Sequence, residues 1–286
     1  MAHKVFIAFL GFAIVTALAA MSIRGCGYYL TPGTKRAFHP KYAELKPTGT
    51  YSHGLGIIGA GLITIGVVTY SSRKRLRMLW SLGKLSIWLE FHIFVCLLGP
   101  ILVVYHTTFK AGGVAAISLW TMLSVAGSGV IGRFLYAQIP RNLAGAELSE
   151  TQIRAEIDRL GKSLSTNPLG AQIAKIVDES FAALKRPDSL WDAVKSFVRL
   201  RIVRRHVSGT IRMLISTSRL SRSHAAALTH AADARAILLQ RALVVSQVGK
   251  LFHLWHVIHL PFSAIMFITL AAHVAVTVAL GYHWIF

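Results

Sequence analysis

Charged residues, and acidic residues above all, are scarce in this chain. Only 15% of its 286 residues are charged, and 11 acidic residues face 31 basic ones. Soluble domains ordinarily carry about a quarter charged residues, whereas here 54% are hydrophobic and the mean hydropathy is +0.55. This excludes an ordinary soluble domain. It favours an all-helical, polytopic membrane protein, because lipid offers unpaired backbone groups no hydrogen-bond partner.

Cysteine is also scarce, and its placement excludes several redox centres. The two cysteines are Cys26 and Cys96, and Cys96 lies inside an apolar run, so no disulfide is expected. The chain has no C-x-x-C-H motif, no iron–sulfur cysteine cluster and no flavin motif. Any c-type haem, iron–sulfur cluster or flavin that works with this chain must therefore sit on a partner subunit.

The formal net charge of +20 has no nucleic-acid recognition motif beside it. A basic balance in a membrane protein is more often a topology signal or a contact with anionic headgroups. We therefore expect lipid, and not nucleic acid, as the partner of these charges.

Five apolar segments are long enough to cross a bilayer, which takes about 20 residues. The first, 4–23, could also be read as a signal peptide, but its length and the absence of a clean cleavage site favour an uncleaved span. The sequence predicts four spans within residues 1–136 and a last span within 246–286. The other four segments are 52–70, 85–109, 113–136 and 257–284.

A short basic loop sets the expected orientation. Arg73, Lys74, Arg75 and Arg77 fall between the second and third segments, and short basic loops stay on the cytoplasmic side. This predicts a cytoplasmic N-terminus and a C-terminus outside, in a bacterial-type inner membrane. The basic residues of the loop 24–51 weaken the prediction, although they are more widely spread.

Residues 137–245 differ in character from the rest. Nine of the eleven acidic residues of the chain and more than half of its 31 basic residues lie there. A capping box of Ser149 and Gln152 predicts a helix that stops near Gly161, and two amphipathic patterns follow at 167–187 and 188–206. A further helix should start near Ser221 and run into the last span. We expect a basic, helical cytoplasmic region, either a small domain or helices lying on the membrane, whose solvated surface needs no specific ligand.

Four histidines repeat one spacing inside the third and fifth apolar segments. His92 and His106 are 14 residues apart, and so are His259 and His273. Fourteen residues rise about 21 Å and complete about 3.9 helical turns, so each pair shares a helix face. The two spans run in the same direction, which puts His92 level with His259 and His106 level with His273. Neutral imidazole binds iron well, so the pattern predicts two haems, each with two histidine ligands.

The stretch "FHLWHVIHLPF" offers three histidines for one of these positions. His259 is 14 residues from His273, whereas His256 is 17 residues away and turned by about 100°. His259 is therefore the expected ligand and His253 an interfacial residue. Pro261 could kink the helix just after His259, which keeps His256 as the alternative ligand.

The two H-x13-H stretches, "HIFVCLLGPILVVYH" and "HLPFSAIMFITLAAH", resemble those of the di-haem integral-membrane cytochromes of b type. The resemblance covers the second to fifth spans. It implies two b haems in a four-helix bundle and electron transfer linked to a quinone pool, with quinone or quinol as a further ligand. The insertion of about 110 residues before the last span departs from the best-known members, so none of their quinone sites is carried over.

Five further residues are candidates for contact with the haems. Gly113 and Gly127 are again 14 residues apart and could let a flat cofactor approach, although small residues are also the usual means of helix packing in membranes. Arg133 near one membrane face, and Lys110 and Arg24 near the other, could meet haem propionates, or could simply anchor the helix ends at the interface.

The sequence thus favours an electron-transfer subunit of an oxidoreductase complex, with iron–sulfur, flavin or c-type cytochrome subunits as partners. Two alternatives stay open. One is a membrane anchor whose basic region docks a cytoplasmic subunit. The other is a proton or solute transporter with histidine relays, although the inverted repeat common in transporters is lacking.

Overall fold

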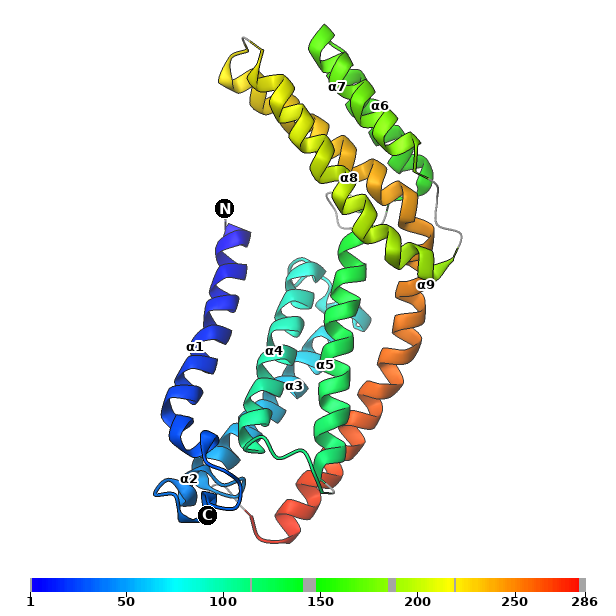
Figure 1. Ribbon diagram of the computed structural model, residues 1–286. Coiled ribbons are helices and arrows are strands. Elements are labelled where there is room, and N and C mark those ends of the chain that lie inside the picture. Colours follow the sequence, from blue (N-terminus) through cyan, green and yellow to red (C-terminus); the bar gives the residue numbers. More distant parts are fainter. Residues whose placement is uncertain (1, 114, 141–147, 185–188, 219, 283–286) are drawn as a thin grey trace. The chain divides into compact units, whose positions relative to one another are not determined.

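The structure, a computed structural model, describes residues 2–113, 115–140, 148–184, 189–218 and 220–282, and these contain helices and no strand (Figure 1). The chain divides into two compact units. One comprises residues 1–130 and 258–286, and we call it the membrane unit. The other, residues 131–257, we call the inserted unit. The predicted all-helical class is confirmed.

Five helices among the described residues are long and apolar enough to cross a membrane. They make the chain a multi-pass membrane protein, as the hydropathy predicted. The third ends at His106, three residues earlier than expected, because Thr108 and Phe109 turn the chain with positive φ angles of 53° and 62°. The five are α1 (Ala2–Leu30), α3 (Thr50–Arg75), α4 (Leu85–His106), α5 (Ala115–Gln138) and α9 (Arg222–Ala279).

Helices α3 and α4 pack against each other through glycines. A Cβ atom on Gly59 would lie 2.8 Å from the backbone oxygen of Gly99, and one on Gly99 would lie 2.7 Å from the oxygen of Gly59. Gly66 makes room for a methyl group of the Val95 side chain. No real Cβ fits at such distances, so these glycines let the two backbones approach as small residues do in membrane helices.

The connection between α1 and α3 is tied to the end of α4 by one arginine. It contains η1 (Arg36–Phe38) and α2 (Tyr42–Leu45). The Arg36 guanidinium donates hydrogen bonds of 2.8–2.9 Å to three backbone oxygens, those of Thr31, Tyr29 and Thr108. Helix α1 also contacts α4 directly, where the hydroxyls of Ser22 and Tyr105 lie 2.5 Å apart.

The predicted basic loop is partly helical. Helix α3 continues through Arg73, Lys74 and Arg75 before the short η2 (Arg77–Leu79). Arg73 is only 7% exposed, and its Nη2 donates at 2.8 Å to the backbone oxygens of Trp80 and Gly83. One cation of this group therefore closes the loop that leads to α4.

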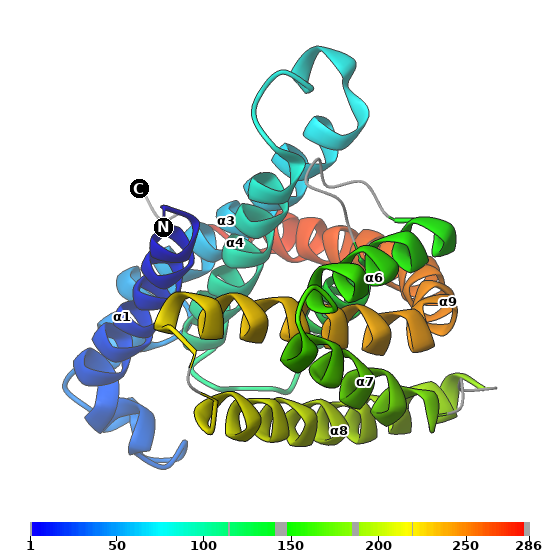
Figure 2. The same cartoon turned by 90° about the horizontal axis from the view of Figure 1, so that it is seen from above.

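The inserted unit contains α6 (Glu150–Leu164), α7 (Pro168–Ala182), α8 (Leu190–Ser216) and the first part of α9. Figures 1 and 2 both show α8 running beside that part of α9. The predicted helices are confirmed, as are the capping box of Ser149 and Gln152 and the start of α9 next to Ser221. The core holds Leu164, Ile173, Val177, Phe181, Leu200, Val207, Ile211, Ala232, Ala236, Val244 and Val248.

The predicted stop at Gly161 is wrong, because α6 continues to Leu164. Gly161 instead makes room for an arginine of α9: a Cβ atom there would lie 2.5 Å from Nη1 of Arg235. Arg235 donates at 2.9 and 3.0 Å to the two carboxylate oxygens of Asp178 on α7, and also to the backbone oxygen of Ile157 on α6. One side chain thus joins three helices.

The glycine contact predicts different effects for two neighbouring substitutions in α3. Gly59→Ala should lower the stability of the protein in detergent by about 1–3 kcal/mol, because the new methyl group meets the α4 backbone. Gly61→Ala is the matched control. It places a methyl group in open space and should leave stability equal or slightly higher. Thermal unfolding followed by circular dichroism measures both, and equal midpoints would contradict the packing role of Gly59.

Arg235 predicts a second stability difference. Arg235→Ala should cost about 2–3 kcal/mol, because Asp178 and the oxygen of Ile157 lose a largely buried partner. Arg159→Ala removes an exposed arginine that pairs with Glu156 on the same helix, and should leave the midpoint unchanged. Chemical denaturation of the two variants compares them, and an unaffected Arg235 variant would refute the three-helix contact.

Candidate functional site

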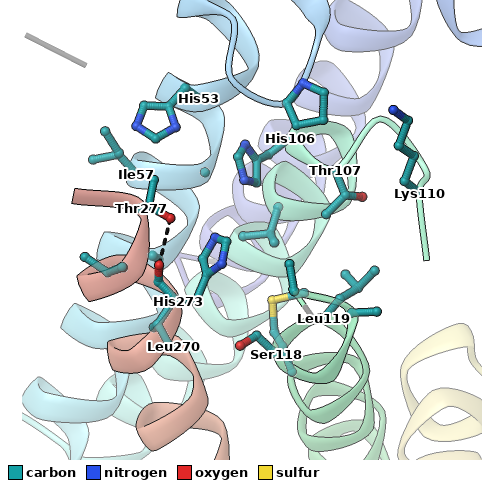
Figure 3. Close-up of a pocket in the computed structure, with 18 of the residues that line it drawn as sticks. His53, Ile57, His106, Thr107, Lys110, Ser118, Leu119, Leu270, His273 and Thr277 are labelled. Atoms are coloured by element: carbon teal, nitrogen blue, oxygen red, sulfur yellow. Dashed lines mark hydrogen bonds between the residues drawn. The ribbon is translucent and has the colours of Figure 1, made fainter. Parts of the chain in front are cut away.

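A cavity of about 610 Å³ lies in the membrane unit, between α3, α4, α5 and the last part of α9 (Figure 3). Its size falls within the roughly 300–1,000 Å³ of pockets that hold small molecules and cofactors. Its walls are mainly apolar. The lining side chains include Ile57, Ile63, Val103, Leu119, Met122, Met266, Leu270 and Val274, with Lys110, Thr107 and three histidines as the main polar groups.

His106 of α4 and His273 of α9 both line this cavity. Their ring centroids lie 6.5 Å apart, and the ring planes make an angle of 66°. The sequence predicted these two residues at the same level from spacing alone. The structure brings them together across the cavity, from helices that are far apart along the chain (Figure 3).

His53 is the third histidine of the cavity, and sequence reasoning missed it. Its ring centroid is 6.0 Å from that of His106. His53 is not one of the four histidines that the 14-residue spacing pairs within the third and fifth apolar segments. The available signal was its place at the start of the second apolar segment, which the structure shows as the first turn of α3.

The backbone of α3 fixes the proton position on His106. Its Nδ1 lies 2.9 Å from the backbone oxygen of Ser52. Because a carbonyl oxygen only accepts, Nδ1 carries the hydrogen and the lone pair is on Nε2. The contact is close because position 56 is glycine: a Cβ there would lie 2.9 Å from the His106 ring.

His92 of α4 makes the same kind of hydrogen bond to the backbone of α3, 14 residues before His106. Its Nδ1 lies 3.1 Å from the backbone oxygen of Gly66, and its ring stacks on Tyr70 with the centroids 5.2 Å apart. Ser52 and Gly66 are 14 residues apart, as are the two histidines they meet. The antiparallel pair α3–α4 therefore repeats one hydrogen bond at two levels.

His259 is held by α5 in an equivalent way. Its Nδ1 lies 2.7 Å from the hydroxyl oxygen of Ser128, and that hydroxyl donates at 2.8 Å to the backbone oxygen of Val125. The serine has a single hydrogen, so it accepts from Nδ1–H, and the lone pair of His259 is on Nε2. Three of the four predicted ligands thus share one tautomer.

The two predicted pairs differ in how the structure presents them. The rings of His106 and His273 approach each other edge-on, whereas the contacts above join His92 to α3 and His259 to α5. The alternative ligand His256 belongs to the inserted unit, where its ring meets Phe252 and Trp255 edge-on.

The remaining candidates lie in different surroundings. Gly113 precedes α5 with a φ of +83°, outside any helix, and Gly127 lies within α5 with no atom within 4 Å of a Cβ placed there. Arg133 belongs to the inserted unit, with its guanidinium carbon 5.6 Å from the ring centroid of Tyr136. Their contacts with a haem stay predictions.

The hydrogen bond of His259 predicts an effect on its tautomer. Nitrogen-15 NMR of histidine-labelled protein should show His259 protonated at Nδ1, and Ser128→Ala should turn this into a mixture of tautomers, because Nδ1–H loses its acceptor. Ser263→Ala is the control, since the Ser263 hydroxyl donates to the backbone oxygen of His259 and not to its ring. An unchanged His259 spectrum in Ser128→Ala would contradict the assignment.

Comparison with protein-family models, curated proteins and solved structures finds no match to this chain. The histidine geometry and the cavity are the features that bear on its function.

Proposed function

We propose that this chain is a membrane b-type cytochrome subunit. It carries electrons between two haems across the bilayer, each haem held by two histidines. It links a quinone pool to a redox partner in a complex of the respiratory or photosynthetic type. The observation that carries the proposal is the His106–His273 pair, two facing imidazoles in an apolar intramembrane cavity.

The distance between the two rings fits two ligands of one iron. An imidazole nitrogen binds a transition-metal ion such as iron at about 2 Å, and that nitrogen lies about 1 Å from the centre of its ring. The centres of two imidazole rings that bind one iron from opposite sides are therefore roughly 6 Å apart. The observed value is 6.5 Å. The angle of 66° between the planes is compatible, because each ring can rotate about its own iron–nitrogen axis.

Two imidazoles complete a coordination shell only if the cofactor brings further ligands, as a porphyrin does. The apolar walls suit its macrocycle, and Leu119, Met122 and Leu270 are among the side chains that would contact it. Lys110 lines the same cavity and offers a cation for a propionate. Arg24, the other cation considered near this face, instead pairs with Glu44 at 3.3 Å.

The hydrogen bonds of the rings also suit metal ligands. A histidine that binds a metal usually donates its other N–H to a carbonyl, carboxylate or other acceptor, which fixes the ring and raises the basicity of the coordinating nitrogen. His92 and His106 donate to backbone oxygens, and His259 donates to Ser128. This supports Nε2 as the coordinating atom in all three.

When bound, haem supplies reversible one-electron chemistry at its iron. The chain supplies two levels for it, since 14 residues of α4 separate His92 from His106 by about 21 Å. A hydrocarbon core is about 30 Å thick, so the two levels cover most of it. His92 and His259 are the proposed ligands of the second haem, and the quinone and the partner subunits follow from the resemblance.

A visible spectrum with haem counting tests the proposal. The protein purified from a haem-replete host should carry two b haems. His106→Ala and His273→Ala should each reduce the content to one, because each removes a ligand of the same haem. His224→Ala, at the start of α9 and bonded to Ser221, is the control and should keep both.

Two results would refute the proposal. One is a colourless protein with native helix content. The other is a content of two haems in His106→Ala and His273→Ala alike. Uptake of protons or solute by vesicles that contain such a colourless protein would favour the transporter instead.

A further inference from the structure

Helix α8 is apolar on two opposite faces. One face packs into the inserted unit through Leu200, Val207 and Ile211, each at most 3% exposed. Successive residues turn by about 100°, so Val198, Ile202, Gly209 and Met213 fall on a narrow stripe on the other side. The three large members of that stripe are 66, 62 and 69% exposed.

Basic side chains flank this exposed stripe on both sides. The same helical geometry puts Arg201, Arg205 and Arg212 along one edge and Arg199 along the other, and all four are exposed. In total α8 has six basic residues and one acidic residue. We call Val198, Ile202, Met213 and these four arginines the outward face of α8.

The neighbouring helices show that this pattern is particular to α8. Helices α6 and α7 together carry five acidic and four basic residues. None of their described large hydrophobic side chains is among the exposed ones. They have the ordinary pattern of one buried face and one mixed polar face.

We propose that the outward face of α8 binds the surface of an anionic lipid bilayer. An apolar stripe between rows of arginine is the pattern of helices that lie in the membrane interface. Each basic residue is attracted by anionic headgroups, and the apolar side chains gain by leaving water. This inference does not depend on haem.

The connectivity argues for lipid over an acidic protein as the occupant. The chain passes from the membrane unit to the inserted unit within helix α5, and it returns within helix α9. Lipid headgroups are therefore always near this unit at a high local concentration, as in any tethered interaction. A soluble acidic partner would have to compete with them.

Spin labels on the full chain in nanodiscs test the proposal. In a Cys26→Ser, Cys96→Ala background, one label is placed by Ile202→Cys on the outward face and another by Gln172→Cys on the exposed side of α7. Discs of phosphatidylcholine alone are compared with discs that contain about one-third phosphatidylglycerol. Power saturation then measures collisions with a water-soluble nickel chelate and with oxygen, which concentrates in lipid.

In anionic discs the Ile202 label should be several-fold less accessible to nickel and more accessible to oxygen than the Gln172 label. In neutral discs the two labels should be alike. Adding Arg201→Gln, Arg205→Gln and Arg212→Gln should abolish the protection, because each arginine at an anionic surface contributes about fivefold. Arg154→Gln, Lys162→Gln and Lys175→Gln on α6 and α7 form the control with the same loss of charge, and should preserve it.

Three results would overturn the proposal. One is equal nickel access for the two labels in anionic discs. The second is equal protection of Ile202 in both kinds of disc, which would remove the role of charge. The third is protection that arises only when a soluble acidic protein is added. Circular dichroism of every variant establishes that the helices are intact, and haem content plays no part in the readout.

Discussion

The close approach of α3 to α4 at Gly59 and Gly99 is the contact on which the candidate site depends. Because the two backbones nearly touch there, carbonyl groups of α3 can reach imidazoles of α4 on either side of it. The contact lies midway between the two hydrogen bonds, Ser52 to His106 and Gly66 to His92. A larger residue at the centre would separate both histidine rings from their acceptors. One packing contact between α3 and α4 therefore determines the geometry of both hydrogen bonds.

Hydropathy and local signals were sufficient to predict the spans, the inserted helices and the start of α6, since each depends on residues close in the sequence. The predicted helix end at Gly161 is wrong because this glycine makes room for the side chain of Arg235, which is distant in the sequence. In the site, helical spacing predicted which histidines share a level. It could not identify His53, which is placed by its position in the wall of the cavity. Nor could it identify the tautomers, which depend on hydrogen-bond acceptors of a neighbouring helix.

The excess of basic residues resolves into several physical roles. Arg36 and Arg73 satisfy backbone oxygens where the chain turns between membrane helices. Arg235 joins three helices of the inserted unit. Arg199, Arg201, Arg205 and Arg212 of α8 are exposed beside apolar side chains, where they can meet an anionic surface. Net charge alone describes none of these differences, because each depends on what surrounds the guanidinium.

The position of the facing histidines along the chain has a consequence for biosynthesis. His53 and His106 precede the inserted unit in the chain, whereas His273 follows it. At about 5–20 residues per second, the ribosome makes His273 on the order of ten seconds after His106. The helical hairpin of α3 and α4 can therefore insert and pack before α9 exists. A ligand held by both His106 and His273 can therefore be bound fully only after α9 has been made, so α9 completes the site.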